Sequence, residues 1–471
     1  MQKKISKSLI VNRVLGHSTD FGNRIAFGKI NYSKLGRLIC GLSAQITGPR
    51  VLIACSQRHD SYIGMLAALH AGATYAPLNV DAPIDRQNQV ISQFDPTDII
   101  QGSNQAMRWH DAIRVGAEAA LFPQKATAAP AYVIFTSGST GDPKGVVISR
   151  RAMDHFVAWA VEALEITPNS RISQHPNVAF DLSVMDIFSG LYAGAQIFPI
   201  QSSVDKLFPG RLILREQLSH WISVPSVIDL MAKDKELGLN NFKTLNKMVF
   251  CGEPLLPRHL RFIFEHNRTV SVLNTYGPTE ATVCMTKLEL LTDNWQIKVR
   301  GSAPLGDAIP GMKIELEGGQ DANQGEIVLS GRQIAEGYWR SPDLTDKVFK
   351  NGRYYTGDWG EIIHGELYFK SRIDRQIKIH GHRIELGDIE DTISKFISGA
   401  VACVEIDNVV IAFLEENSRQ ISEVKSFIDE KLPVYMRPRK IFTLLRLPRS
   451  LNDKVDYKVL TKTAKGELRN E

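Results

Sequence analysis

The sequence predicts an α/β protein with a large N-terminal domain, built of layered α/β subdomains and a small antiparallel β subdomain, and a small α+β domain at the C-terminus. Three observations support this prediction. At 471 residues the chain is too long for a single hydrophobic core. Apolar strand-like runs alternate with helix-like stretches, which favours a mainly parallel sheet covered by helices. Short strands broken by Gly, Asn and Asp then occupy about residues 313–367, ahead of a compact helix, strand, strand, helix pattern.

Several stretches justify the individual elements. The run "VLIACSQRHDSYIGMLAALHAGATYAPL" predicts a buried strand, a helix and a second strand, and "YVIFTSGSTGDPKGVVIS" predicts a strand, a loop and a strand. Two further strands are predicted at "KMVFCGE" and "TVSVLNTYG", separated by the helix-like "PLLPRHLRFIFEHN". The small domain is predicted from "IELGDIEDTISKFI", "AVACVEIDNVVIAFLEE" and "SEVKSFIDEKL". We place the boundary near Arg372 to Gln376, which gives domains at 1–373 and 374–471.

Composition excludes several classes of protein. The chain is 43% hydrophobic and 23% charged, as in ordinary globular proteins. Its five cysteines form no CxxC pair, which argues against a disulfide framework or a thiolate zinc site and favours a reduced, cytoplasmic setting. No apolar run approaches the ~18 residues of a membrane helix, and the N-terminal run is too short for a signal peptide. We therefore expect no membrane span.

Positive charge is concentrated at the end of the chain. Residues 433–471 contain ten Lys and Arg against four Asp and Glu, a balance of +6, whereas the whole chain carries +5. Such a tail could meet the phosphates of a nucleotide or an acidic protein, although a solvated face is an equally good interpretation. No aromatic residues are interleaved in a nucleic-acid-binding pattern, so we expect no nucleic acid partner.

The loop between the strands of "YVIFTSGSTGDPKGVVIS" is the first candidate for chemistry. It lacks the GxxxxGK[ST] spacing of a P-loop and is followed by a strand rather than a helix. Its glycines allow the backbone to approach an anion, and its hydroxyls and lysine can donate to that anion. A mobile hairpin is the structural alternative. The residues are Thr136, Ser137, Gly138, Ser139, Thr140, Gly141, Lys144 and Gly145.

Two further stretches offer groups suited to a nucleotide. In "NTYGPTEATV", Tyr276 offers a flat face for a base, while Thr279 and Glu280 offer the hard oxygens that Mg²⁺ prefers. In "YYTGDWG", Asp358 is placed to accept the hydroxyls of a ribose. Each stretch taken alone could be an ordinary turn. Arg372, Lys378 and Lys454 supply cations at or beyond the domain boundary, and their structural alternative is a solvated basic face.

The order of these stretches resembles the adenylate-forming (ANL) superfamily, specifically the adenylation domains of nonribosomal peptide synthesis. The resemblance extends from "INYSKL" to "NDKVDYK" and so covers nearly the whole chain. It implies the ANL fold, with a mobile C-terminal lid that rotates about a hinge at Asp374. The motifs, in order, are "TSGSTGDPKG", "FDLSVMDIF", "NTYGPTEATV", "GEIVLSGRQIAEGYW", "YTGDWG", "RIDRQIKIHGHRIELGDIE" and "LPVYMRP".

The resemblance also implies a reaction in two steps. A carboxylate attacks the α-phosphate of ATP and releases pyrophosphate, and a thiol then displaces AMP to give a thioester. By this resemblance, the Thr136 to Lys144 loop holds the β- and γ-phosphates, Glu280 holds Mg²⁺, and Lys454 contacts the substrate carboxylate and the α-phosphate. The catalytic residues are thus Lys454, Glu280 and Thr136. The remaining ATP-binding residues implied are Asn274, Thr275, Tyr276, Thr279, Asp358 and Arg372.

Two positions depart from the family pattern. The glycine usual before the catalytic lysine is Asp453 here, and the glycine usual before the hinge-region arginine is Ser371. Asp453 places a negative charge beside Lys454, so the conformation of that loop is in question.

The stretch "VAFDLSVMDIF" bears on the acid that is activated. In amino-acid-activating relatives the Asp of FDxS binds the α-ammonium group, and the matching residue is Asp181. A carboxylate in an apolar pocket is costly unless it meets a cation, so an amino acid is favoured over a fatty or aryl acid. The alternative is that Asp181 caps a helix. The predicted pocket, which contains no second charge, comprises Leu182, Met185, Ile222, Val249, Cys251, Gly252, Thr275, Val283 and Cys284.

The strings "FDLSVMDI", "VPSVIDLM", "FCGEPLLP" and "NTYGPTEATV" most resemble the D-alanine–D-alanyl carrier protein ligase family. This resemblance favours D-alanine as substrate, although Ile222 and Cys284 stand where that family is expected to have Thr and Ala. A buried structural cysteine is the alternative for Cys251 and Cys284. The chain stops soon after "NDKVDYK", so we expect the thiol to come from the phosphopantetheine arm of a separate, acidic carrier protein.

Three alternatives are open at this stage. The chain could be a stand-alone adenylation enzyme of a natural-product pathway for L-alanine, proline or a β-amino acid. It could be an acyl-CoA synthetase, which Asp181 argues against. It could also be a non-catalytic nucleotide-binding regulator, which only Asp453 favours.

Overall fold

The chain forms two compact units. The first contains residues 1–80, 93–135 and 145–371, and the second contains 81–92, 136–144 and 372–471. The predicted domains 1–373 and 374–471 stay a prediction. The computed structural model describes residues 8–56, 58–103, 112–116, 118–122, 124–125, 127–138, 142–415, 420–449 and 455–469.

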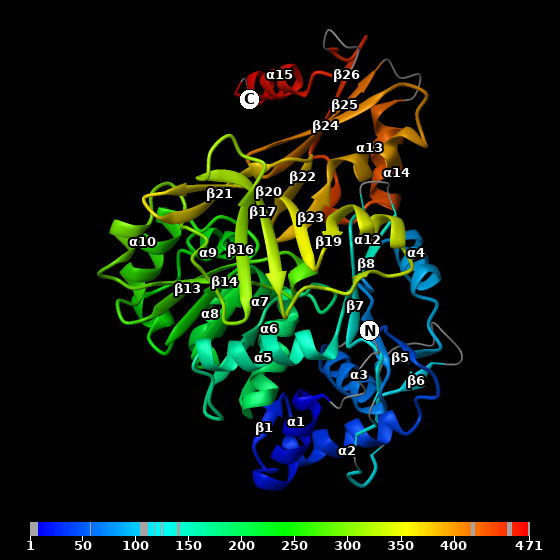
Figure 1. Ribbon diagram of the computed structural model, residues 1–471, viewed down its shortest axis with the longest axis vertical. Coiled ribbons are helices and arrows are strands. Elements are labelled where there is room, and N and C mark those ends of the chain that lie inside the picture. The colour runs from blue at the N-terminus through cyan, green and yellow to red at the C-terminus, as the bar shows by residue number, and fades with distance from the viewer. Residues whose placement is uncertain are drawn as a thin grey trace. The chain divides into compact units, whose positions relative to one another are not determined.

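The first unit is built on two large, mainly parallel sheets (Figure 1). Hydrophobic runs without polar alternation are expected when both faces of a parallel sheet are covered. In spatial order, the described strands of one sheet are β18 (Gly337–Tyr338), β8 (Lys144–Ile148), β7 (Tyr132–Thr136), β4 (Thr74–Pro77), β3 (Arg50–Ile53), β5 (Asp98–Gln101) and β6 (Ile113–Arg114). Those of the other are β15 (Asp307–Ala308), β14 (Thr286–Leu290), β13 (Ser271–Tyr276), β12 (Lys247–Phe250), β11 (His220–Ser223), β9 (Arg171–Gln174), β10 (Gln196–Pro199), β1 (Ile25–Phe27) and β2 (Ile30–Asn31).

The second of these sheets buries both faces. Successive side chains of a strand point to opposite sides. On β12, Val249 therefore joins the main core of the unit, whereas Met248 and Phe250 join a separate core on the other face. On β11 the same alternation separates Ile222 from Trp221.

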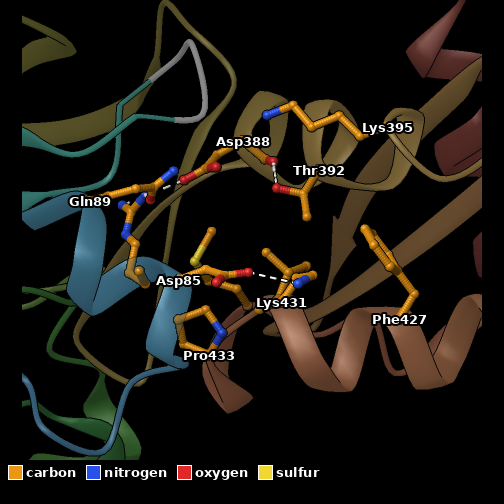
Figure 2. A pocket seen from close by; sticks show the side chains of 11 residues that line it. Asp85, Gln89, Asp388, Thr392, Lys395, Phe427, Lys431 and Pro433 are labelled. Atoms are coloured by element: carbon orange, nitrogen blue, oxygen red, sulfur yellow. Dashed lines mark hydrogen bonds and ion pairs between the residues drawn. The ribbon is translucent and has the colours of Figure 1, made fainter.

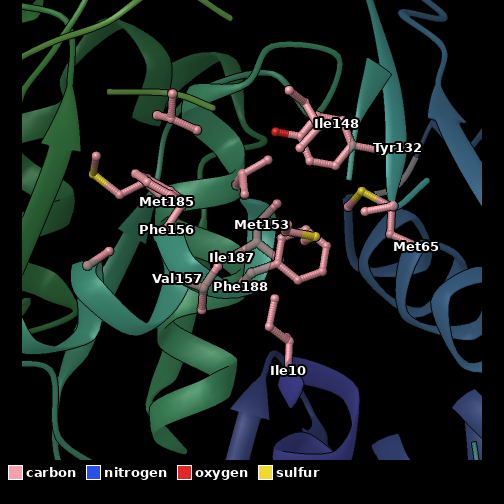
Figure 3. Close-up of a cluster of buried hydrophobic side chains, with 14 of the residues drawn as sticks. Ile10, Met65, Tyr132, Ile148, Met153, Phe156, Val157, Met185, Ile187 and Phe188 are labelled. Carbon is pink, nitrogen blue, oxygen red and sulfur yellow. The ribbon is translucent and has the colours of Figure 1, made fainter. Parts of the chain in front are cut away.

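The main core of the first unit contains side chains from both sheets and from the helices α5 and α6. Figure 3 shows Met153, Phe156 and Val157 of α5 beside Ile187 and Phe188 of α6. Ser149 begins α5 by accepting a hydrogen bond from the amide of Ala152. The helices of the first unit are α1 (Leu9–Asp20), α2 (Tyr32–Ser43), α3 (Arg58–Ala71), α5 (Arg150–Ala163), α6 (Leu182–Ala193), α7 (Ser203–Leu207), α8 (Pro209–Arg215), α9 (Ser226–Met231), α10 (Pro257–His266), α11 (Trp295–Lys298) and α12 (Pro342–Val348), with short 3₁₀ turns η1 (Leu239–Phe242) and η2 (Thr279–Ala281).

The predicted small antiparallel subdomain is confirmed. Its strands pair antiparallel along the order β16, β17, β20 and β19, and a further strand pairs with β20. The strands are β16 (Met312–Glu317), β17 (Gln324–Gly331), β19 (Phe349–Lys350), β20 (Arg353–Ile363) and β21 (Glu366–Arg372).

The second unit contains a sheet covered on both faces by helices (Figure 1). Cys403 and Ala412 point to the side of α13 and α14, whereas Val404 and Phe413 point to the side of α15. The predicted helix, strand, strand, helix order is confirmed as α13, β24, β25 and α14. The elements are α4 (Ile84–Phe94), whose last two residues fall in the first unit, β22 (Gln376–Ile379), β23 (His382–Glu385), α13 (Leu386–Ser394), β24 (Val401–Ile406), β25 (Val409–Glu415), α14 (Ile421–Lys431), η3 (Val434–Met436), β26 (Lys440–Leu444) and α15 (Tyr457–Arg469).

Candidate active site

Two of the residues predicted to bind a nucleotide lie together in the first unit. Tyr276 ends β13, and Asp358 lies within β20, 82 residues further along the chain. The Tyr276 hydroxyl donates a hydrogen bond of 2.6 Å to Oδ2 of Asp358. Both side chains are buried. The aromatic ring and the carboxylate are therefore fixed relative to each other without a ligand.

A second carboxylate, four residues after Tyr276, also accepts a hydrogen bond from a tyrosine. Glu280 lies in the short turn η2 and is fully buried. Its Oε1 accepts a hydrogen bond of 2.7 Å from the hydroxyl of Tyr338, which lies on β18. We call Tyr276, Glu280, Tyr338 and Asp358 the carboxylate corner. The sequence analysis missed Tyr338, although it lies in the family-like stretch "GEIVLSGRQIAEGYW".

The backbone around Glu280 is unusual. Thr282 and Val283 both have positive φ angles, 56° and 73°, although they are β-branched. Such a backbone costs on the order of 1–3 kcal/mol per residue and persists only where the surroundings hold it. Here the Thr282 hydroxyl donates to the carbonyl of Gln333 at 2.6 Å. Gly277 is required on steric grounds, because a Cβ atom there would lie 2.5 Å from Cα of Cys284.

The apolar residues of the predicted amino acid pocket share one buried cluster. Val249 lies opposite Ile222 on the neighbouring strand, so the side chains of β11 and β12 are in register here. The Cys251 thiol lies 3.8 Å from the carbonyl oxygen of Val283 and can donate weakly to it. We call the set the apolar wall. It consists of Leu182, Met185, Ile222, Val249, Cys251, Val283 and Cys284.

Asp181 occupies the N-cap position of α6 but does not cap it. Its φ and ψ angles are −63° and −28°, already helical, and its side chain makes no capping hydrogen bond. The helix therefore does not require this carboxylate. The alternative interpretation of Asp181 as a helix cap loses its physical basis.

The pKa of the Cys284 thiol depends on the groups around it. Burial raises its pKa well above the ordinary value, and the charges of Cys251 and Asp181 add to the rise, whereas a hydrogen bond to Thr275 opposes it. The charge of Asp181 therefore affects Cys284, a member of the apolar wall.

The hydroxyl of Thr275 donates to the carbonyl of Phe250 at 2.9 Å, and the side-chain amide of Asn274 donates to the carbonyl of Pro304 at 2.8 Å. Thr279 is buried, and Gly252 has a φ of 95°.

The described part of the glycine-rich loop belongs to the second unit. Ser137 donates to the carbonyl of Arg383 at 2.8 Å, and Lys144 forms an ion pair with Glu385 at 4.0 Å. Thr136 lies 3.4 Å from the carbonyl of Lys144. Gly138 approaches the carbonyl of Asp142 so closely that a Cβ atom would lie 2.2 Å from it. Ser139, Thr140, Gly141 and Lys454 lie outside the described residues.

The predicted ribose ligand Arg372 and the predicted hinge residue Asp374 contact each other. Nε of Arg372 donates to Oδ1 of Asp374 at 2.8 Å. Burial favours the neutral form of Asp374, but the hydrogen bond and charge of Arg372 outweigh it and lower the pKa of the carboxyl group. The pair is therefore charged near neutral pH.

The second unit also contains a cavity of about 210 Å³ that the sequence analysis did not predict (Figure 2). Asp85 of α4 and Lys431 of α14 point toward each other there and form an ion pair of 2.7 Å. Asp388 of α13 is buried beside Arg86, at 3.7 Å. The mixture of charges selects no particular class of ligand.

The fold and the site define an adenylate-forming enzyme. A family model described as AMP-binding enzyme matches residues 28–339, and the chain belongs to this family. The fold is that of the Vibrio cholerae adenylation domain AlmE, whose structure was solved with glycyl-adenosine-5′-phosphate: the TM-score is 0.85 over 99% of both chains, at 24% identity.

Two curated relatives are similar over most of their length. The D-alanine–D-alanyl carrier protein ligase of Listeria monocytogenes is 32% identical over 441 residues, which cover 84% of this chain and 86% of the relative. The ligase of the same name from Staphylococcus epidermidis is 30% identical and covers 86% and 87%. In the part of the chain that the structure describes, no helix is long and apolar enough to cross a membrane.

Proposed function

We propose that the chain activates a small amino acid, with D-alanine favoured, as an aminoacyl-adenylate and transfers it to the phosphopantetheine thiol of a separate carrier protein. One observation carries this proposal: the apolar wall is buried and none of its residues is charged, and its member Leu182 directly follows Asp181 at the start of α6. The charge of Asp181 also contributes to the raised pKa of Cys284 in that wall. Because an uncompensated charge is costly there, the carboxylate suits a ligand that brings its own ammonium group. An α-amino acid does so, whereas a fatty acid does not.

The apolar wall argues for a small side chain. Met185 and Ile222 are bulky and fully buried members of this wall, which favours a small substrate side chain. None of the wall residues is charged, so a charged substrate side chain would be left without a partner. The names of the two curated relatives support D-alanine in particular and a carrier protein as acceptor.

The carboxylate corner suits the nucleotide. Tyr276 offers its ring to the adenine, and Asp358 accepts hydrogen bonds from the ribose hydroxyls. The Thr136 to Lys144 loop donates to the departing pyrophosphate. Lys454 stabilises the negative charge that develops as the substrate carboxylate attacks the α-phosphorus, and the bond to pyrophosphate breaks.

The donor chemistry of the corner fits a Mg²⁺ ion. Glu280 provides a hard carboxylate oxygen, and Thr279 provides a neighbouring hydroxyl. Among the described residues, no group of three or more His, Cys, Asp or Glu could hold a metal, so nucleotide phosphates and water would complete the coordination. When bound, the ion neutralises charge on the phosphates.

The outer face of α15 supports an acidic carrier as the partner. Lys458, Lys462 and Lys465 are exposed and lie at helical spacings of four and three residues, so they share one face. Leu460 and Ala464, on the opposite face, are buried in the core of the unit. Because exposed charges are screened by salt, raising the ionic strength should weaken carrier loading more than adenylate formation. Equal loss in both reactions would count against this surface.

Amino-acid-dependent exchange between ATP and labelled pyrophosphate tests the proposal. The panel contains both alanine enantiomers, glycine, proline, a β-amino acid and a fatty acid. We expect D-alanine to give the highest kcat/KM, and a phosphopantetheinylated carrier, not coenzyme A, to accept the aminoacyl group. If none of the amino acids in the panel supports exchange, the proposal is refuted and a nucleotide-binding regulator is favoured.

A further inference from the structure

We propose that Arg58 is a positioning residue that fixes the loop from His175 to Phe180 and thereby holds Asp181 at the ammonium group of the substrate. The inference rests on the proposed role of Asp181. It gives Arg58, in the first turn of α3, a role in amino acid selection. Arg58 and Asp181 are 123 positions apart in the sequence, so the sequence alone does not suggest this role.

One nitrogen of Arg58 binds the beginning of the loop. Four acceptor oxygens lie within 3.1 Å of its Nη1 atom: the backbone carbonyl and side-chain Oε1 of Gln174, and the carbonyls of His175 and Pro176. Three consecutive carbonyls that converge on one cation fix the direction in which the chain leaves β9. A charged donor makes stronger hydrogen bonds than a neutral one.

The side chain of Gln174 is itself held from two sides. Tyr62, one turn further along α3, donates to Oε1 of Gln174 at 2.8 Å, and Nε2 of Gln174 donates to the carbonyl of Pro176. Tyr62 and Gln174 are buried. Helix α3 therefore holds the end of β9 through a hydrogen-bond network that has these two buried side chains at its centre.

The chain between this network and Asp181 is a succession of local hydrogen bonds. Asn177 accepts from the amide of Ala179 at 3.0 Å, and its carbonyl accepts from the amide of Phe180 at 2.9 Å. Ser183 then donates to the carbonyl of Phe180 at 2.7 Å. A displacement of His175 or Pro176 is therefore transmitted along the turn to Asp181 instead of being absorbed.

Arg58 also has a charge partner, and this determines how the inference is tested. Asp186 of α6 is fully buried, which raises the pKa of its carboxyl group, and the charge of Arg58 is the main opposing influence, ahead of hydrogen bonds from the Ile187 backbone and the Gln174 side chain. Replacing Arg58 by a neutral residue would therefore disturb folding. Lysine keeps the charge, but its side chain is shorter, so its ammonium nitrogen does not reach the position of Nη1 among the four acceptors.

The experiment measures D-alanine-dependent pyrophosphate exchange and thermal unfolding for the full chain and its variants. For Arg58→Lys we expect KM for D-alanine to rise roughly tenfold, with KM for ATP and kcat within about twofold. Asn177→Ala removes the side-chain acceptor of the turn and leaves the charge of Arg58 in place. It should likewise raise KM for D-alanine without changing KM for ATP or kcat. Arg171→Lys is the matched control, because Arg171 lies on β9 and donates to the carbonyl of Glu216 at 2.7 Å, away from the loop. Its constants should not change.

The outcomes separate this inference from the proposed function. If Asp181→Asn raises KM for D-alanine and Arg58→Lys does not, the positioning role is wrong while the proposed function stands. If Arg58→Lys lowers the Tm and impairs both substrates equally, Arg58 is only structural and the inference fails. If Asp181→Asn leaves KM for D-alanine unchanged, the proposed role of Asp181 fails, and the inference that depends on it is overturned.

Discussion

Two pairs of buried carboxylates differ in how their oxygens are partnered. Glu280 and Asp358 of the carboxylate corner are 0% and 2% exposed, and Asp186 and Asp388 are equally buried at 0% and 2%. Each member of the first pair accepts a hydrogen bond from a tyrosine hydroxyl. In the second pair the main opposing group is an arginine: Arg86 lies 3.7 Å from Oδ2 of Asp388, and the charge of Arg58 acts on Asp186. Burial is thus the same, but the groups that face the carboxylates differ.

The two pairs also differ in what acts on their oxygens. Burial raises the pKa of Asp186 well above its ordinary value, with Arg58 as the main opposing charge. Burial also raises the pKa of Asp388 to about 6, opposed chiefly by Arg86. In the corner, by contrast, a tyrosine hydroxyl orients each carboxylate.

The largest expected effect is the loss of the Glu280 charge. Glu280→Gln preserves shape but removes the anionic oxygen proposed to hold Mg²⁺, so pyrophosphate exchange should fall about a hundredfold or more. Asp388→Asn makes the same chemical change at an equally buried carboxylate and should keep exchange within about threefold. Similar losses in both variants would show that the comparison between the two pairs has no functional meaning.

The second prediction concerns stability and pH at Asp388. Its pKa rises from 3.8 to about 6 in the folded chain, so the folded state holds the proton more tightly. The free energy of unfolding should therefore fall as the pH rises from about 4 to about 6, by at most about 3 kcal/mol, and stay reduced above that window. Urea unfolding of Asp388→Asn at several pH values should lack this contribution.

The matched control lies on α14 of the same unit. Asp429 forms an exposed ion pair with Arg437 at 2.8 Å, so Asp429→Asn should keep the pH dependence of the unmodified chain. An unchanged slope in Asp388→Asn would mean that the carboxyl group is not protonated near pH 6 and that the two pairs are not distinct.

The third prediction removes the donor and keeps the carboxylate. Tyr338→Phe leaves Oε1 of Glu280 without its 2.7 Å hydrogen bond. A hydrogen bond to a charged group contributes about 1.5–3 kcal/mol, so kcat/KM for ATP should fall roughly tenfold to a hundredfold. The concentration of Mg²⁺ needed for half-maximal exchange should rise, because the carboxylate is no longer held in a fixed orientation by its donor. Activity that is unaffected at every Mg²⁺ concentration would contradict the pairing.

The local sequence pattern predicted much of the fold but little of the pairing between buried carboxylates and tyrosine hydroxyls. The strand, loop, strand reading of "YVIFTSGSTGDPKGVVIS" is confirmed by β7 and β8. The helix predicted from Ile384 is wrong in its first turn, because Ile384 and Glu385 pair with Ile377 and Gln376 on β22, and α13 begins at Leu386. A residue next to a strand can be added to that strand by pairing with the neighbouring strand, and the local hydrophobic periodicity does not predict such pairing.

The contacts of the site lie further apart in sequence. Tyr338 reaches Glu280 across 58 residues, and Arg58 reaches Gln174 across 116. Such pairs depend on the order of strands in a sheet, not on neighbouring residues. The positive φ angles of Thr282 and Val283 run against the preference of β-branched residues, so they could not be anticipated either. The roles of the predicted site residues stay predictions until variants are measured.

The smallest expected effect is that of Tyr276→Phe. The ring that is proposed to face the adenine is kept, and only the hydroxyl that donates to Asp358 at 2.6 Å is lost. Asp358 keeps both of its oxygens and can still accept from the ribose hydroxyls, so KM for ATP should rise only about threefold, with kcat and KM for D-alanine unchanged. Titration with ATP and with an analogue that lacks the 2′-hydroxyl would separate the two uses of the carboxylate. If the variant loses discrimination between them, the tyrosine orients Asp358. If it binds ATP as weakly as Asp358→Ala, the hydroxyl matters as much as the carboxylate, and the small effect predicted here is wrong.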